Sequence, residues 1–134
     1  MTIQLTDLTK RFGDLTAVDS IDLDVDNGEV LCLLGPSGCG KTTTLRMIAG
    51  LEFATKGDVI LGGNRVNELA PRERNVAMSF QFYALYPSLS VADNLASPLH
   101  AEGIAGAEID KRVAQVSKTL QLDAILIRTP GHLA

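Results

Sequence analysis

Residues 30–42 read VLCLLGPSGCGKT, an apolar run that leads directly into the spacing G-x-x-x-x-G-K-T between Gly35 and Thr42. The apolar run from Val30 to Leu34 is typical of a buried β-strand. The residues that follow, Thr43 to Leu51, have the pattern of an amphipathic helix. A strand, a glycine-rich turn and a helix in this order predict a loop that binds phosphate groups.

This spacing is the P-loop motif, and each of its parts has a physical reason. Glycines allow backbone N–H groups to turn toward phosphate oxygens, and the N-terminus of the following helix adds a partial positive charge. Lys41 is then expected to reach the β- and γ-phosphates of a nucleotide, and the hydroxyl of Thr42 to bind Mg²⁺. The alternative is a glycine-rich turn with an incidental lysine, and the predicted flanking strand and helix argue against it.

The composition limits the classes of function. The chain has 134 residues, which favours a single domain, and 46% of them are hydrophobic, enough for a core. A net charge of −4 and a pI near 5.0 argue against a nucleic-acid partner. Two cysteines, Cys32 and Cys39, do not suggest a disulfide framework, so a reducing compartment fits. We find no signal-peptide pattern and no run of about 20 apolar residues, so we expect a partner to supply any membrane span.

Alternating apolar and polar residues predict further strands around the glycine-rich loop. Besides the strand at 30–34, we expect an edge strand over 3–8, a turn over 10–14, and strands over 17–25, 58–61 and 75–82. Cys32 is expected to be buried as a small apolar residue of its strand. The helix after the loop is expected to bury Leu45, Met47, Ile48 and Ala49.

The later part of the sequence predicts helices. Ser90-Val91-Ala92-Asp93 resembles a capping box with Asp in place of Glu or Gln, so a helix should begin there and end near Glu102. A second amphipathic helix is expected over 107–122, and a short third one over 123–127. The stripe expected to be apolar on the second helix contains Ile109, Val113, Val116 and Leu120.

Four features, each at its expected place along the chain, resemble the ATP-binding subunit of an ABC transporter, over about residues 3–133. The first is the glycine-rich loop and its helix. The second is Phe12, which stands where the family has an aromatic residue that stacks on adenine. The third is Ser79-Phe80-Gln81, which resembles the Q-loop, whose glutamine reaches the region of the Mg²⁺ and the attacking water. The fourth, Tyr83-Ala84-Leu85-Tyr86-Pro87 followed by Ser90-Val91 and Asn94, is similar to the segment that meets the membrane subunits.

The resemblance implies an α/β fold of the P-loop NTPase class: a truncated RecA-like core with an N-terminal antiparallel β subdomain and the start of a helical subdomain. It divides the chain into residues 1–86, which dock the nucleotide, and 87–134, which begin the helical subdomain. ATP and Mg²⁺ are the implied cofactors, with Thr42 and Gln81 at the metal and Lys41 and Gln81 in catalysis. The residues implied to hold ATP are Phe12, Val18, Ser37, Gly38, Cys39, Gly40, Lys41, Thr42 and Thr43.

The implied partners are the transmembrane subunits of a transporter, contacted by about Tyr83–Leu89, and a second ATP-binding subunit. The resemblance is closest to importers of sugars and related solutes, which implies a peripheral position at the cytoplasmic face of the cell membrane. Each assignment has a structural alternative: Phe12 could pack in a turn, Gln81 could be an ordinary polar residue at a strand end, and Tyr83–Pro87 could belong to the core.

The sequence also departs from the family. We find no apolar run that ends in Asp-Glu and no Leu-Ser-Gly-Gly-Gln signature, and His100 and His132 come too early to be the family's switch histidine. We therefore expect ATP binding without hydrolysis by this chain alone. We also expect low stability, or self-association through an unpaired edge of the strand at 30–34. Two alternatives stay open: another small P-loop nucleotide enzyme, and a non-catalytic interaction fragment that docks on a membrane protein.

Overall fold

The computed structural model describes residues 1–82 and 84–133, which form two compact units. The first unit is Met1–Met78 and the second is Ser79–Ala134. The sequence places a functional boundary at residue 86, and that functional division stays a prediction. Tyr83, the first residue of the proposed membrane-subunit contact, lies outside the described residues.

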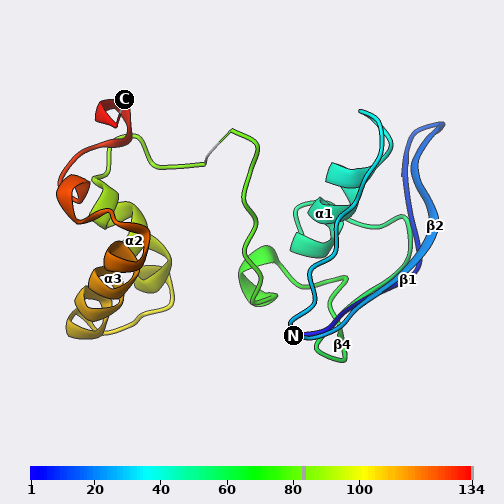
Figure 1. Ribbon diagram of the computed structural model, residues 1–134. Coiled ribbons are helices and arrows are strands. Elements are labelled where there is room, and N and C mark those ends of the chain that lie inside the picture. The colour runs from blue at the N-terminus through cyan, green and yellow to red at the C-terminus, as the bar shows by residue number, and fades with distance from the viewer. Residues whose placement is uncertain (83, 134) are drawn as a thin grey trace. The chain divides into compact units, whose positions relative to one another are not determined.

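The first unit contains a four-stranded sheet with the order β2-β1-β3-β4 (Figure 1). Its strands are β1 (Ile3–Phe12), β2 (Leu15–Val25), β3 (Lys56–Leu61) and β4 (Asn64–Arg65), and all neighbouring pairs are antiparallel. The prediction of an edge strand followed by a turn was wrong for β1. Because β2 and β3 pair with its two sides, β1 is an inner strand, and it continues to Phe12.

The long β1–β2 hairpin is irregular in its middle. The register shifts between Leu5 and Leu8, and Asp7 and Ser20 take the left-handed backbone conformation, with φ of 48° and 45°. The hydroxyl of Thr9 accepts a hydrogen bond from the N–H of Ser20 at 3.0 Å, so this backbone group is satisfied where the ladder is broken. The hairpin therefore stays paired as far as its tip, where Phe12 lies opposite Leu15.

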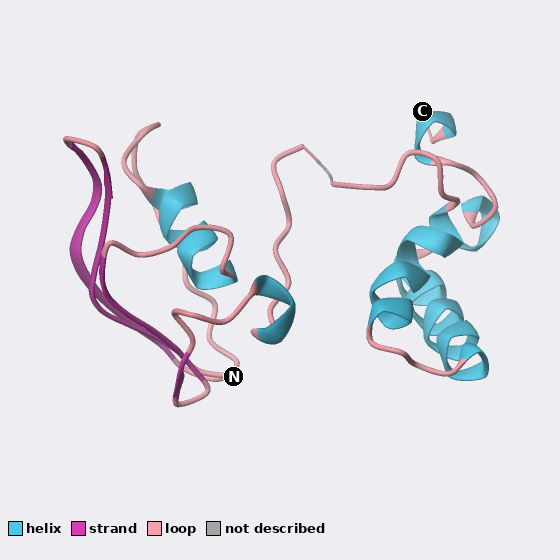
Figure 2. Ribbon diagram, turned by 180° about the vertical axis from the view of Figure 1, so that it is seen from behind, coloured by secondary structure: helices cyan, strands magenta, loops and turns pink. Residues whose placement is uncertain are grey.

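Helix α1 (Lys41–Ala49) lies beside this hairpin in both views (Figures 1 and 2). Its buried face consists of Thr44, Met47 and Ala49, and Met47 joins the core formed by the sheet. The buried members of that core are Leu5, Leu8, Val18, Met47, Val59, Leu61 and Val66. The prediction for Leu45 was wrong: it lies outside the buried face and is about half exposed.

Two of the predicted strands are absent from the described residues. Residues 30–34 and 75–82 are drawn as loop in Figure 2, and no strand is formed there. Val30 and Leu34 are 89% and 90% exposed, and Cys32 is exposed where the sequence predicts burial. A strand needs a neighbour to exchange backbone hydrogen bonds with it, and the only sheet among the described residues consists of β1 to β4. Apolar sequence alone therefore does not produce the strand.

The second unit is helical, as predicted. Helix α2 (Val91–Ala101) begins at the predicted capping box, in which the Ser90 hydroxyl accepts a hydrogen bond from the Asp93 N–H at 3.1 Å. Helix α3 (Gly106–Leu120) packs against α2. Of its predicted apolar stripe, Ile109 is buried, whereas Val116 and Leu120 are exposed. Short 3-10 helices occur at Asp123–Ile125 and Pro130–His132 here, and at Pro71–Glu73 in the first unit.

No helix in the part of the chain that the structure describes is both long enough and apolar enough to span a bilayer.

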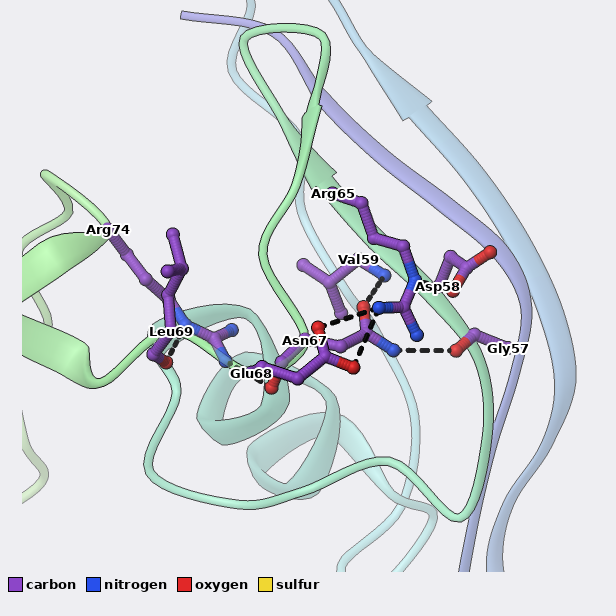
Figure 3. A network of polar contacts seen from close by, with 8 residues as sticks. All are labelled: Gly57, Asp58, Val59, Arg65, Asn67, Glu68, Leu69 and Arg74. Atoms are coloured by element: carbon purple, nitrogen blue, oxygen red, sulfur yellow. Dashed lines mark hydrogen bonds and ion pairs between the residues drawn. The ribbon is translucent and has the colours of Figure 1, made fainter.

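A polar network joins the end of α1 to the chain after β4 (Figure 3). The guanidinium of Arg74, which is 3% exposed, donates hydrogen bonds to the carbonyl oxygens of Met47, Ile48, Asn67 and Leu69 at 2.8–3.2 Å. The Asn67 side chain in turn accepts from the Val59 N–H and donates to the Gly57 carbonyl. Arg74 therefore holds the C-terminal end of α1, where the helix dipole favours a positive charge.

Candidate phosphate-binding site

The glycine-rich loop ends in a helix N-terminus whose backbone donors are not used by a side-chain cap. Gly40 is the N-cap residue, with φ of 95°, and it contributes no side-chain hydrogen bond. No acidic residue lies in the first turn of α1. The first N–H groups of a helix have no partner within the helix, and the aligned peptide dipoles make this end positive. The sequence therefore produces a set of donors that suits an anion.

Gly40 is also packed closely against the hairpin. A Cβ at this position would lie 3.2 Å from Val18 Cγ2 and would overlap the carbonyl oxygen of Ala17. Only glycine combines this close approach with the left-handed conformation that starts the helix. The N-terminus of α1 is thus held against β2 by a residue that the motif requires.

The ammonium group of Lys41 bends back over the loop. Lys41 Nζ donates to the carbonyl oxygens of Gly35 and Pro36, each at 2.7 Å, and lies 3.4 Å from the Sγ of Cys39. These contacts hold the positive charge of Lys41 over the glycine-rich loop, next to the N-terminus of α1. Lys41 is therefore positioned to add charge to the same anion-binding surface.

The other predicted loop residues are accessible to a ligand. Ser37, Gly38, Cys39 and Thr42 are exposed, and Gly40 and Thr43 are partly exposed. The Thr42 hydroxyl lies in the first turn of α1, beside Lys41 in the sequence. Among residues 1–82 and 84–133, no three His, Cys, Asp or Glu side chains gather as a metal site.

Phe12, the predicted adenine platform, lies at the tip of the hairpin and is 47% exposed. Lys10 Nζ lies 4.8 Å from the centre of the Phe12 ring. Val18 is opposite Lys10 in the hairpin and is almost completely buried, beneath Gly40. Phe12, Val18 and the loop therefore belong to the same unit, and Val18 packs against the loop at Gly40.

The sequence reasoning missed Lys10. Its ammonium forms an ion pair with Glu52 at 2.7 Å and donates to the Phe53 carbonyl at 2.8 Å. The hydrogen bond from Lys10 lowers the pKa of the Glu52 carboxyl below its usual range. Only one sequence signal places Lys10 beside Phe12: the two are separated by two positions, and residues two apart in a strand share a face.

Gln81 and the proposed contact segment belong to the second unit. Gln81 is exposed, and its role at the metal stays a prediction. Leu85 and Tyr86 are both about half exposed. Asn94 of α2 fixes the backbone around them: its side chain accepts from the Tyr86 N–H at 2.8 Å and donates to the carbonyl oxygens of Tyr86, Leu89 and Ser90. An apolar surface is thus presented by an ordered loop.

A glycine-rich loop that feeds an uncapped helix beside an antiparallel subdomain defines a nucleotide-binding protein of the P-loop class. The family model described as ABC transporter matches residues 18–133. The chain belongs to the ABC transporter family. It is 53% identical over 133 residues to the xylose/arabinose import ATP-binding protein XacJ of Haloferax volcanii, and 48% identical over 132 residues to the maltose/maltodextrin import ATP-binding protein MalK of Yersinia pestis. Each alignment covers 98% of this chain.

Solved structures agree with this assignment. The dimeric ATP-binding cassette MJ0796 in a post-hydrolysis state, bound to ADP and Pi, superposes with a TM-score of 0.84 at 27% identity. That match covers 98% of this chain and 63% of the cassette. The chain spans just over a third of the curated relatives, 35% of XacJ and 36% of MalK.

Proposed function

We propose that this chain binds Mg-ATP as the nucleotide-docking part of the energy-coupling subunit of an importer for sugars or related solutes. One observation carries the proposal: a glycine-rich loop leads into the uncapped N-terminus of α1, and the ammonium of Lys41 is held over that loop. Backbone donors, a helix dipole and a cation at one place suit the phosphates of a nucleotide.

The proposed roles of the individual residues are those that the family resemblance implies. Ser37, Gly38, Cys39, Gly40 and Thr43 would present backbone groups to the phosphates, and Lys41 would neutralise their charge. The Thr42 hydroxyl would bind the Mg²⁺ ion. For Gln81, a role at the metal is proposed from the family resemblance alone. Phe12 would stack on the adenine, for which its accessible ring is suited. The bound Mg²⁺ supplies charge neutralisation at the β- and γ-phosphates.

The importer assignment is supported by the relatives, which are ATP-binding proteins for the import of xylose, arabinose, maltose and sn-glycerol-3-phosphate. We propose that the loop at about Tyr83–Leu89 contacts transmembrane subunits, which places the protein at the cytoplasmic face of the membrane. A second ATP-binding subunit is the other proposed partner, as the dimeric cassette suggests. ATP hydrolysis and solute import are proposed for the assembled transporter and not for these residues alone.

Removal of the Lys41 ammonium tests ATP binding directly. Calorimetric titration of the chain with Mg-ATP should give saturable binding, and Lys41→Ala should weaken it by about 10- to 100-fold, because a charged hydrogen-bonding group is lost. Lys111→Ala, which changes an exposed lysine on α3, is the matched control and should bind like the parent. Circular dichroism establishes that each variant is folded.

The same titration separates the alternatives. A folded parent that does not bind Mg-ATP would contradict the proposal and would favour an interaction fragment that docks through the exposed residues Leu85 and Tyr86. Equal binding by the parent and by Lys41→Ala would show that any nucleotide binds elsewhere.

A further inference from the structure

The Lys10 side chain is 12% exposed, although lysine is seldom buried without a partner. Its ammonium is fixed by two oxygen atoms, Glu52 Oε1 at 2.7 Å and the Phe53 carbonyl at 2.8 Å. The same ammonium lies 4.8 Å from the centre of the Phe12 ring, and a cation within about 6 Å of an aromatic ring is attracted to its face. Lys10 therefore presents an anchored positive charge to one face of Phe12.

The contact between Lys10 and Phe12 limits which face of the Phe12 ring can stack on a base. Phe12 is 47% exposed at the tip of a hairpin, where little else would fix the orientation of its ring. Since the ammonium covers one face of the ring, a purine must stack on the opposite face. A ring that is already oriented loses less conformational freedom when the base binds.

The contact also connects the ring to the phosphate-binding helix. Glu52 and Phe53 lie just after the C-cap of α1 at Gly50, and Thr55, two residues further on, donates from its N–H to the Thr9 carbonyl at 2.8 Å. At the opposite end of α1, Gly40 packs on Val18, the cross-strand partner of Lys10. Both ends of the helix are thus attached to the hairpin that carries Phe12.

From this geometry we propose that Lys10 is a positioning residue for the base of the nucleotide. It orients the Phe12 ring and, through Glu52 and Phe53, fixes the ring relative to the helix whose N-terminus holds the phosphates. The inference rests on the proposed function, since it concerns the same nucleotide. It makes a separate prediction: loss of Lys10 should weaken binding of the base and leave binding of the phosphates unchanged.

Two ligands separate these effects: Mg-ATP, which has a base, and Mg-tripolyphosphate, which has none. In calorimetric titrations of the chain, Lys10→Met should raise the Kd for Mg-ATP about three- to fivefold, because binding would then have to order the Phe12 ring. The Kd for Mg-tripolyphosphate should change by less than about twofold. Lys56→Met removes an ion pair of similar length but greater exposure, with Asp7 at 2.6 Å on the same sheet, and should alter neither value.

Two further variants distinguish positioning from a structural role. Lys10→Arg keeps the cation and should restore the preference for ATP over tripolyphosphate. In a Phe12→Leu background, Lys10→Met should have no additional effect on ATP binding. An equal loss for both ligands, or an unchanged ratio of the two Kd values, would overturn the inference while the proposed function stands. A folded parent that binds neither Mg-ATP nor Mg-tripolyphosphate would overturn both the inference and the proposed function.

Discussion

At the scale of single residues, the carboxyl of Glu52 provides a reporter for its partly buried ion pair with Lys10. The hydrogen bond from Lys10 is the largest cause that lowers the pKa of Glu52 from its ordinary value of 4.5, and burial opposes it. Because this pKa is lower in the folded chain, ionised Glu52 stabilises the fold at any pH above the ordinary value. That contribution is lost as the pH falls from 4.5 through the folded-state pKa.

The expected pH dependence can be measured with Glu52→Gln. At neutral pH the variant should have a lower free energy of unfolding than the parent, by about 0.5–1 kcal/mol, the range for a partly exposed ion pair. The difference should disappear well below pH 4.5, where both side chains are neutral. Urea denaturation at the two pH values measures it. A difference that does not depend on pH would mean that Lys10 and Glu52 do not interact in solution.

The site divides into residues that the sequence reveals and residues that it does not. Gly35 to Thr42 form a contiguous motif, and the helix predicted after it is present as α1, so the candidate phosphate-binding loop could be predicted from adjacent residues although the strand predicted before it is absent from the described residues. Lys10 depends on a partner 43 residues away, and only folding brings the two together. The sequence could not show that this lysine is buried beside the predicted adenine platform.

At the scale of elements, α1 is anchored at its C-terminal end by one side chain. Gly50 takes the left-handed conformation there, and a Cβ at that position would lie 2.5 Å from Nε of Arg74. The guanidinium thus lies directly across the end of the helix and donates hydrogen bonds to the Met47 and Ile48 carbonyl oxygens. Burial lowers the pKa of Arg74 from its ordinary value, but an arginine stays charged in this setting.

Replacement of Arg74 by Met should therefore destabilise the first unit. Four carbonyl oxygens would lose a charged donor, and we expect a loss of about 2–3 kcal/mol in the free energy of unfolding. Arg72→Met, two residues earlier and exposed, is the matched control and should change stability by less than about 0.5 kcal/mol. Urea denaturation followed by circular dichroism provides both values. Similar losses for the two variants would show that the carbonyl contacts contribute little.

Helices could be predicted better than strands, and the reason is physical. The capping box at Ser90 and Asp93 is a local hydrogen-bonded unit, so the start of α2 follows from four adjacent residues. The predicted strands at 30–34 and 75–82 require a neighbouring strand, which local sequence cannot provide. The burial predicted for Cys32 was wrong for the same reason.

At the scale of the whole molecule, the segment at 30–34 presents apolar side chains to solvent. Val30 and Leu34 are almost fully exposed, and Leu31 is partly so. Exposed apolar chain with unused backbone groups is a template for association with another chain.

We expect the chain to self-associate through this segment. Sedimentation should show a weight-average mass that rises with protein concentration, and the double variant Val30→Glu, Leu34→Lys should reduce the rise because charged residues oppose edge pairing. Leu120→Lys, at an exposed apolar position of α3, serves as the control and should behave like the parent. A parent that is monomeric at every concentration would contradict the expectation.

The strand order β2-β1-β3-β4 also has a consequence for the order in which the molecule assembles. The β1–β2 hairpin closes over a tight turn between Phe12 and Leu15, so its loop-closure entropy is small. β3 can pair with β1 only after the chain has passed through the glycine loop and α1, which is a much longer closure. We therefore expect the hairpin with Phe12 to form early, and β3 to dock later, when Glu52 is brought to Lys10.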